Sequence, residues 1–164
     1  MTGSNPVDRS KLGTKRHILT DKNGIPLSAV ITSANRHDVK AVTDVVDNAV
    51  ARRPHPSHLT KGRRKQLQHL CLDRAYISKS AEQEMIKRGL VPHMPHKRWM
   101  GQKGETNQRQ HPSAKNRRWV VERTNSWHNR FRKLFTRYEK KAENYLGLVQ
   151  LSCSIIVYRK VILG

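Results

Sequence analysis

Asp73 is the first side chain of this sequence whose type and setting could do chemistry. It directly follows the short apolar run His69–Leu72, and ligands in open α/β sheets gather at the carboxyl ends of strands. A carboxylate in that place can hold a hard divalent cation, which prefers oxygen ligands. A lone Asp more often forms a turn or caps a helix, so both interpretations stay open.

Glu122 is the second candidate, because it is a single acid among many basic residues on a helix predicted over 116–138. At about 100° per residue, Glu122 lies opposite the apolar face, which must pack on a core. An isolated carboxylate on a phosphate-binding helix repels the ligand unless a metal ion lies between them. A surface Glu paired with Arg118 or Ser126 is the alternative. The apolar face comprises Val120, Trp127, Phe131, Leu134, Phe135 and Tyr138, and the stripe with Glu122 comprises Ser126, Asn129 and Lys133.

The net charge of the chain indicates a polyanionic partner. There are 33 Lys and Arg residues against 12 Asp and Glu in 164 residues, a formal charge of +21. The excess is spread along the whole chain, and nucleic acid is the usual partner of such a protein because each neutralised phosphate releases a counterion. The apolar stretch Tyr145–Tyr158 falls short of the ~20 residues that span a bilayer, so we expect a buried helix and no membrane partner. Nine His residues invite a zinc hypothesis, but the loop residues His55, His58, His93, His96 and His111 have no Cys nearby and no zinc-module spacing.

The elements that must position Asp73 and Glu122 follow from local patterns. Asn23-Gly24 between two apolar runs predicts a β-hairpin, and Gly89 is a typical stop for the helix before it. The order of strands and helices belongs to an α/β layer architecture. We expect strands at 16–20, 25–32, 69–73 and 90–94, and helices at 37–50 (capped by Asn35), 78–88, 116–138 and from Lys141 to the end. We expect an exposed basic segment at 1–15 and basic loops at 52–66 and 95–115.

Three segments of the chain, 4–42, 70–76 ("LCLDRAY") and 117–159, resemble bacterial insertion-sequence transposases of the Asp-Asp-Glu (DDE) superfamily. The segment "VVERTNSWHNRFRKLFTRYEKKAENY" is the most specific of them. The resemblance implies a ribonuclease-H-like mixed sheet flanked by helices. It also implies three carboxylates that bind Mg²⁺ or Mn²⁺ for DNA cleavage and strand transfer.

Carried over by motif, Asp73 is the second carboxylate and Glu122 the third, and both are metal ligands. The basic residues around Glu122 would contact transposon-end DNA. These predicted DNA-binding residues are Arg123, Arg130, Lys133, Arg137 and Lys140.

The first family carboxylate has no counterpart here, since Asp8 matches another element and Asp21 belongs to the hairpin turn. We therefore expect residues 1–164 to be a partial catalytic domain that lacks the first strand and is inactive alone. Partners would be DNA and a second copy, or the product of an upstream reading frame, in a bacterial cytoplasm at the nucleoid. The alternative is a non-catalytic basic nucleic-acid-binding protein or a transposase relic.

Overall fold

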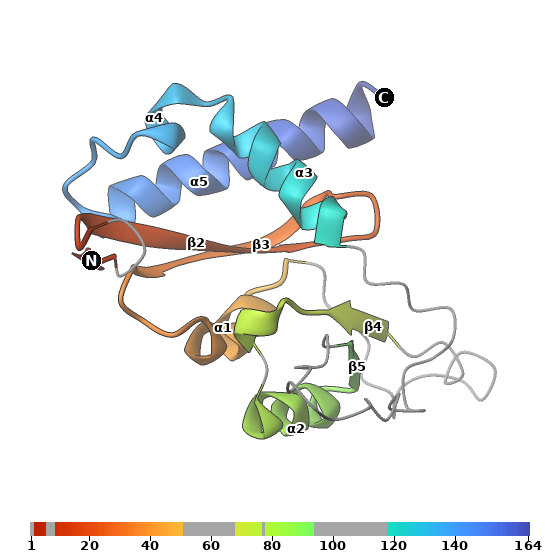
Figure 1. The fold of residues 1–164 in the computed structure, drawn as a ribbon. Coiled ribbons are helices and arrows are strands. Elements are labelled where there is room, and N and C mark those ends of the chain that lie inside the picture. The colour runs from red at the N-terminus through yellow and green to blue at the C-terminus, as the bar shows by residue number, and fades with distance from the viewer. Residues whose placement is uncertain (1, 6–8, 51–67, 77, 94–117) are drawn as a thin grey trace. The chain divides into compact units, whose positions relative to one another are not determined.

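The computed structural model describes residues 2–5, 9–50, 68–76, 78–93 and 118–164 (Figure 1). The chain divides into two units. Unit 1 comprises Met1–Arg52 and Trp119–Gly164, and unit 2 comprises Arg53–Arg118. Unit 1 contains an antiparallel sheet covered by helices, and unit 2 contains a parallel pair of strands with a helix. The expected mixed α/β class is confirmed. The basic loops expected at 52–66 and 95–115 lie essentially outside the described residues.

The hairpin predicted around Asn23-Gly24 forms the centre of unit 1. Strands β2 (Leu12–Thr20) and β3 (Pro26–Ser33) pair in antiparallel register, from Thr14 opposite Ser33 to Thr20 opposite Pro26. Gly24 alone in the turn has a positive φ, +83°, which an L side chain adopts only with strain. The Asp21 side chain accepts hydrogen bonds from the backbone N–H groups of Asn23 and Ile25, both at 2.8 Å. The turn is therefore closed by local contacts.

The N-terminal segment is more regular than the sequence analysis expects. Strand β1 (Gly3–Ser4) pairs with the start of β2, with Gly3 opposite Gly13 and Ser4 opposite Leu12. Gly3 is buried. The prediction of a wholly exposed segment over 1–15 is therefore wrong at β1 and at the first residues of β2, because backbone pairing there requires no apolar alternation.

The helix predicted at 37–50 is shorter than expected. It consists of a 3-10 turn, Asp38–Ala41, followed by α1 (Val42–Asp47). Val42 and Val46 are buried as their spacing predicts, but Val50 is exposed beyond the helix end. The residue before the 3-10 turn is His37, and no side chain caps it, so the cap expected at Asn35 is wrong.

The single helix predicted at 116–138 is wrong, because the structure has two. Helix α3 (Arg118–Asn129) ends, and the short α4 (Arg132–Phe135) follows after an extended residue, Phe131. The break lets Phe131 and Leu134 reach the main core cluster, which also contains Ile31, Tyr145 and Val149. Phe135 and Tyr138 of the predicted apolar face are exposed. In a continuous helix, the predicted apolar face would point in a single direction from 116 to 138.

Helix α5 (Ala142–Val157) packs on the sheet along one face and continues as a π-helical turn, Tyr158–Ile162. Its buried residues are Tyr145, Val149, Ser152 and Ile156, while Leu151 and Tyr158 are exposed. The buried helix expected here is therefore buried on one face only. By length and composition alone, Ala142–Ile162 would suffice to cross a bilayer. A helix packed on a sheet passes the same test, and the Tyr145 and Val149 contacts with Ile31 are of that kind.

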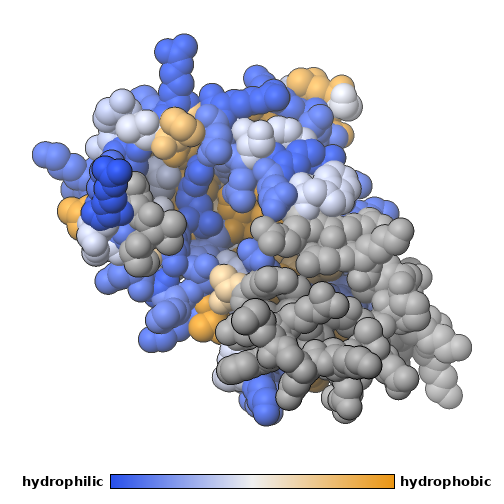
Figure 2. Space-filling model, in the orientation of Figure 1, coloured by the Kyte–Doolittle hydropathy of each residue, from blue (hydrophilic) through white to orange (hydrophobic). Residues whose placement is uncertain are grey.

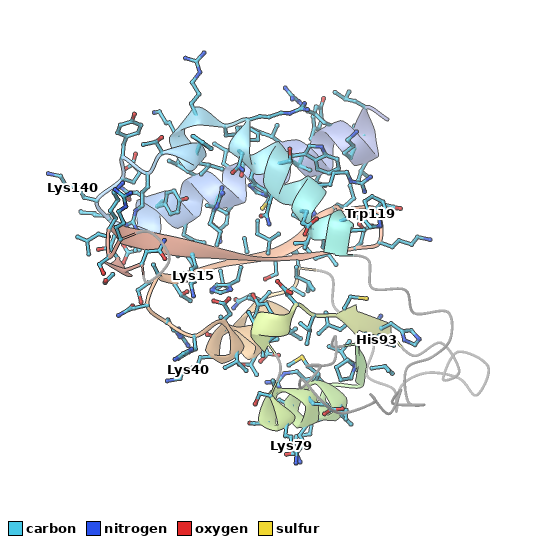
Figure 3. The ribbon with its side chains drawn as sticks, in the orientation of Figure 1. Lys15, Lys40, Lys79, His93, Trp119 and Lys140 are labelled. Atoms are coloured by element: carbon cyan, nitrogen blue, oxygen red, sulfur yellow. The ribbon has the colours of Figure 1, made fainter. Side chains whose placement is uncertain are left out.

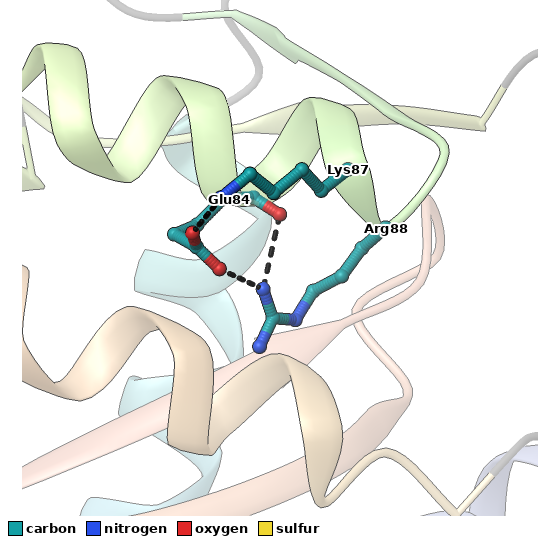
Figure 4. A network of polar contacts seen from close by, with 3 residues as sticks. All are labelled: Glu84, Lys87 and Arg88. Atoms are coloured by element: carbon teal, nitrogen blue, oxygen red, sulfur yellow. Dashed lines mark hydrogen bonds and ion pairs between the residues drawn. The ribbon is translucent and has the colours of Figure 1, made fainter.

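Unit 2 contains a β-α-β arrangement. Strand β4 (Gln68–Cys71) leads through a 3-10 turn, Arg74–Tyr76, to α2 (Lys79–Lys87), and β5 (Leu90–His93) pairs with β4 in parallel. Gly89 has φ +73° after the helix, which confirms the predicted helix stop. The last turn of α2 is tied together by Glu84, which accepts hydrogen bonds from Lys87 and Arg88 (Figure 4). These bonds lower the pKa of Glu84.

Figure 2 shows the hydropathy of one face of the molecule. Among the coloured residues it is largely hydrophilic, with apolar side chains in scattered patches. A contiguous apolar patch would have indicated a protein or membrane contact. A mostly hydrophilic face fits the excess of Lys and Arg.

A buried histidine joins α3 to α5 and is held neutral. His128 has no exposed surface, and its Nδ1 lies 2.8 Å from the Ser152 hydroxyl, which itself donates to the Val149 carbonyl at 2.7 Å. We infer that Nδ1 carries the proton and that Nε2 accepts from the Cys153 thiol, 3.7 Å away. Burial, and then the charge of Arg16, lower the pKa of His128 to about 4.

This histidine predicts a loss of stability in mild acid. The unfolded chain takes up a proton at the ordinary pKa of 6.5, whereas folded His128 does so only near 4. The unfolded state therefore binds more protons between these values, and the free energy of unfolding should fall by up to about 3 kcal/mol as pH drops through that window. Urea unfolding at a series of pH values measures this. His128→Asn should flatten the profile, and exposed His37→Asn is the control. An unchanged profile in His128→Asn would contradict the assignment.

Candidate functional site

Glu122 lies on the outer side of α3. The helix buries Val120, Thr124 and His128, one every four residues, against the rest of unit 1. Glu122 is exposed, as are Ser126 and Asn129 on the same stripe. The predicted outward stripe is confirmed, although the buried face differs from the predicted one: of its members on α3, Val120 is buried and Trp127 only partly so. A carboxylate in this position can meet a ligand in solution.

Two contacts fix α3 to the turn between β2 and β3. The Thr124 hydroxyl donates to the Gly24 carbonyl at 2.7 Å, and Arg123 Nη2 donates to the Asn23 carbonyl. Thr124 is fully buried, and a Cβ placed on Gly24 would lie 3.0 Å from its Oγ1. We call this pair of bonds the turn contact. It sets both the position and the rotation of the helix that carries Glu122.

Arg123 also stacks between two indoles of its own helix. Its guanidinium carbon lies 4.8 Å from the ring centroid of Trp119 and 5.2 Å from that of Trp127. Lys160 Nζ lies 5.3 Å from the Trp127 ring. Trp119, at the end of α3 nearest the hairpin turn, is 55% exposed (Figure 3). Its neighbour Arg123, a predicted DNA-binding residue, is thus already engaged within unit 1.

The remaining predicted DNA-binding residues lie toward the other end of the hairpin. Arg137 donates to the Glu139 carbonyl at 2.8 Å, to the Thr14 hydroxyl and to the Lys140 carbonyl, and it covers the Tyr145 ring at 5.0 Å. Figure 3 shows Lys140 and Trp119 at opposite ends of β2 and β3. From Thr14 to Thr20 the strand rises roughly 20 Å. Arg130, Lys133 and Lys140 are exposed.

Asp73 follows β4 in unit 2, at the carboxyl end of the strand as predicted. The Leu72 N–H donates to the His93 carbonyl at 2.9 Å, which extends the ladder to the residue before Asp73. The Asp73 carbonyl accepts from the Tyr76 N–H at 3.0 Å, so the residue also opens a turn. Its side chain is half-buried. The turn interpretation of Asp73 is therefore confirmed for its backbone carbonyl.

A histidine pair that the sequence analysis missed lies on the same strands. His69 Nδ1 is 2.6 Å from His93 Nε2, and the rings stack with centroids 4.9 Å apart. One nitrogen of the pair donates and the other accepts. Parallel pairing of β4 with β5 brings the two rings together across 24 positions, and no local pattern could have revealed it.

The donor chemistry of the two carboxylates fits a hard divalent cation, since Asp and Glu oxygens are what Mg²⁺ and Mn²⁺ bind. Among the described residues, no group of three or more metal-ligating side chains could hold an ion. Asp73 belongs to unit 2 and Glu122 to unit 1, and each unit is described by itself. Their convergence on one ion therefore stays a prediction.

Comparison with known proteins gives a consistent family. Residues 2–157 match the family model described as "Transposase DDE domain". The chain is 34% identical over 158 residues to a putative transposase for insertion sequence element IS402 from Burkholderia cepacia, covering 96% of this chain and 68% of that protein. No solved structure matches the chain significantly.

The turn contact makes a prediction about stability. Thr124→Val keeps the shape but removes the donor to a buried carbonyl, which should lower the free energy of unfolding by about 1–2 kcal/mol. Gly24→Ala should cost at least as much, because it forces an L side chain to φ +83° and crowds Thr124. Thermal unfolding of both variants, with exposed Thr136→Val as the matched control, measures the effect. Equal melting of Thr124→Val and Thr136→Val would show that the contact contributes nothing.

Proposed function

Because this chain belongs to the transposases with a DDE domain, we propose that it binds transposon DNA and supplies Asp73 and Glu122 to a metal-dependent nuclease site. The observation that carries the proposal is the position of Glu122. It is an exposed acid on a helix fixed to the hairpin, within a chain of charge +21. A carboxylate among so many basic residues weakens phosphate binding unless it binds a cation.

We propose a ribonuclease-H-like fold for the domain, in which the described sheet of unit 1 and the β-α-β of unit 2 belong to one architecture. The parallel β4 and β5, with Asp73 just past β4, are the arrangement in which open sheets collect ligands. The antiparallel hairpin, and α1 as the helix that follows it in the sequence, support the same assignment.

In this proposal, different residues of the chain bind the metal ion, bind DNA phosphates and hold the helices in place. Asp73 and Glu122 would hold Mg²⁺ or Mn²⁺, which when bound supplies charge for in-line attack on a phosphodiester. Exposed Arg130, Lys133 and Lys140 would neutralise phosphates along the hairpin. Arg123 and Arg137 keep α3 and the segment after α4 in place through their bonds to backbone carbonyls.

We also propose the setting in which this happens. The DNA partner is a transposon end, and the site is the bacterial cytoplasm at the nucleoid. Pairing with a second copy, or with the product of an upstream reading frame, would supply further contacts to DNA. DNA binding is the first measurement, because the charge of +21 predicts it directly.

The metal role of Glu122 predicts how binding responds to Mg²⁺. Without divalent ions, Glu122→Gln should bind duplex DNA more tightly than wild type, roughly fivefold, since one charge near a phosphate is worth ~1 kcal/mol in water. With millimolar Mg²⁺ the wild type should gain affinity and Glu122→Gln should not. Asp73→Asn should lose the same Mg²⁺ response.

Fluorescence anisotropy with labelled DNA, in EDTA or in Mg²⁺, measures these changes. Glu143→Gln, which removes another exposed acid of unit 1, is the matched control and should leave the Mg²⁺ response intact. If Glu122→Gln and Asp73→Asn both keep the full wild-type response, the metal-binding assignment fails.

The exposed basic residues make a separate prediction about salt. The logarithm of the binding constant should fall linearly with the logarithm of salt concentration. Lys133→Gln or Lys140→Gln should each reduce the slope by about 0.9, the contribution of one phosphate on duplex DNA. Lys79→Gln, an exposed lysine on α2 shown in Figure 3, is the control. If Lys79→Gln reduces the salt slope and neither Lys133→Gln nor Lys140→Gln does, DNA does not bind at Lys133 and Lys140.

A further inference from the structure

The outward side of α5 carries large apolar side chains that remain exposed. Leu151 and Tyr158 are 58% and 54% exposed, and Val161 and Ile162 in the π-helical turn are 59% and 67% exposed. The opposite side of the helix is the one that packs within unit 1 (Figure 1). Apolar residues gathered on one exposed side of a helix indicate a surface that a partner covers.

The exposed residues of α5 follow the spacing of a coiled coil. Gly147, Leu151, Ser154 and Tyr158 are all exposed, and they are separated by four, three and four residues. This alternation is the spacing of the a and d positions, which face a second helix in a coiled coil. We call these four residues the α5 seam. A helix laid along the seam would contact all four of them.

Gly147 is not required by the packing of the described residues. No atom among them lies within 4 Å of a Cβ placed on this glycine, and its φ is not positive. Glycine inside a helix destabilises the helix relative to alanine. Where two helices meet, however, glycine lets a bulky side chain of the other helix approach the backbone closely. The position of Gly147 in the seam therefore indicates a contact with another helix.

A second copy of α5 that runs in the opposite direction fits the seam by size. Consider two copies related by a twofold axis that passes between positions 152 and 153. Gly147 then lies opposite the partner's Tyr158, and Leu151 lies opposite the partner's Ser154, because both pairs are centred on this point. Each pair joins a small residue to a large one, which is how facing layers interdigitate. In a parallel pair, Tyr158 would face the partner's Tyr158 and Gly147 would face the partner's Gly147.

Charge favours the same arrangement. Two copies that each carry a charge of +21 repel one another. The segment Ala142–Tyr158, which contains the seam, is the longest stretch of the chain without Lys or Arg, so two copies can meet there with no cation between the helices. In the antiparallel pair, Glu143 in the first turn of one helix lies at the level of the partner's Arg159. Opposite charges at the two ends also suit the dipoles of antiparallel helices.

We propose that the α5 seam binds the α5 seam of a second copy of this chain, in antiparallel orientation, and forms a twofold-symmetric dimer. The inference rests on the proposed function only in that it names the surface for the pairing with a second copy. It requires neither DNA nor a metal ion.

Sedimentation equilibrium of the full chain, without DNA or divalent ions, measures the dimer. We expect a dissociation constant in the micromolar range, because one pair of short helices makes a small interface. Leu151→Lys places an ammonium group in the seam and should raise the dissociation constant about tenfold or more. Leu12→Lys replaces another leucine that is 76% exposed, on β2, and is the matched control. A chain that is monomeric at every concentration, or an equal effect of the two lysine variants, overturns the proposal.

An exchange of small and large residues tests the antiparallel register. Gly147→Leu should raise the Tm, since leucine is the better helix former and meets open space within one chain. The same side chain should collide with the partner's Tyr158 and weaken the dimer. Tyr158→Ala makes room for it, so the double variant should dimerise more tightly than Gly147→Leu alone. The two positions lie roughly 16 Å apart along one helix, so only contact between two copies produces this rescue. If the double variant shows no rescue, the antiparallel seam is wrong.

Salt gives a readout opposite in sign to that of DNA binding. Because the two chains repel each other, added NaCl should strengthen the dimer, whereas it weakens binding to DNA. A dimer that salt dissociates would be held by charge and not by the seam, which contradicts the proposal. Flotation with phosphatidylcholine vesicles tests a lipid surface as the occupant. If the wild type floats and Leu151→Lys does not, the seam binds lipid and the proposal falls.

The outcomes for the dimer and for the nuclease site are separable. If the chain stays monomeric while Glu122→Gln and Asp73→Asn lose the Mg²⁺ response, the nuclease assignment stands and the dimer falls. If the seam variants behave as predicted while both acidic substitutions keep the full Mg²⁺ response, the dimer stands and the nuclease assignment falls.

Discussion

The fold of unit 1 depends on how α3 is attached to the hairpin 100 positions earlier in the chain. The hydroxyl of Thr124 reaches the carbonyl of Gly24, and this bond forms only because glycine lets the turn approach so closely. With the bond in place, the rotation of the helix is determined. Thr124 faces inward, Glu122 faces solvent, and the flank with Trp119 and Arg123 lies between them. The function proposed for Glu122 depends on that rotation.

The other end of α3 is fixed by a different set of polar contacts. His128 bonds to Ser152 of α5, and Asn129 accepts from Arg16 of β2 at 2.8 Å. A neutral His in an apolar site stabilises the fold as long as it stays neutral. The basic residues near α3 consequently fall into two kinds. Arg16, Arg123 and Arg137 bond to other parts of unit 1, whereas Arg130, Lys133 and Lys140 are exposed.

The sequence was sufficient to predict features that depend on a few neighbouring residues, such as turns and helix ends. Asn23-Gly24 fixed the hairpin and Gly89 the end of α2, because both depend on backbone conformations that few residues adopt. The buried face of α3 was misjudged because Thr124 and His128 are polar, and their burial is possible only with partners distant in sequence. The break before Phe131 was missed for the same reason. The apolar residues keep a helical period through the break. Only the tertiary structure shows that Phe131 and Leu134 pack in the core cluster with Ile31.

In the proposed function, the charge of Glu122 would couple the binding of a cation to the binding of DNA. In a strongly basic chain an exposed acid opposes phosphate binding, and a divalent cation beside it reverses the sign of that interaction. Cation and DNA then raise each other's affinity by the same factor, because such coupling is reciprocal. A cation site of few ligands is weak on its own and becomes occupied when a phosphate completes it.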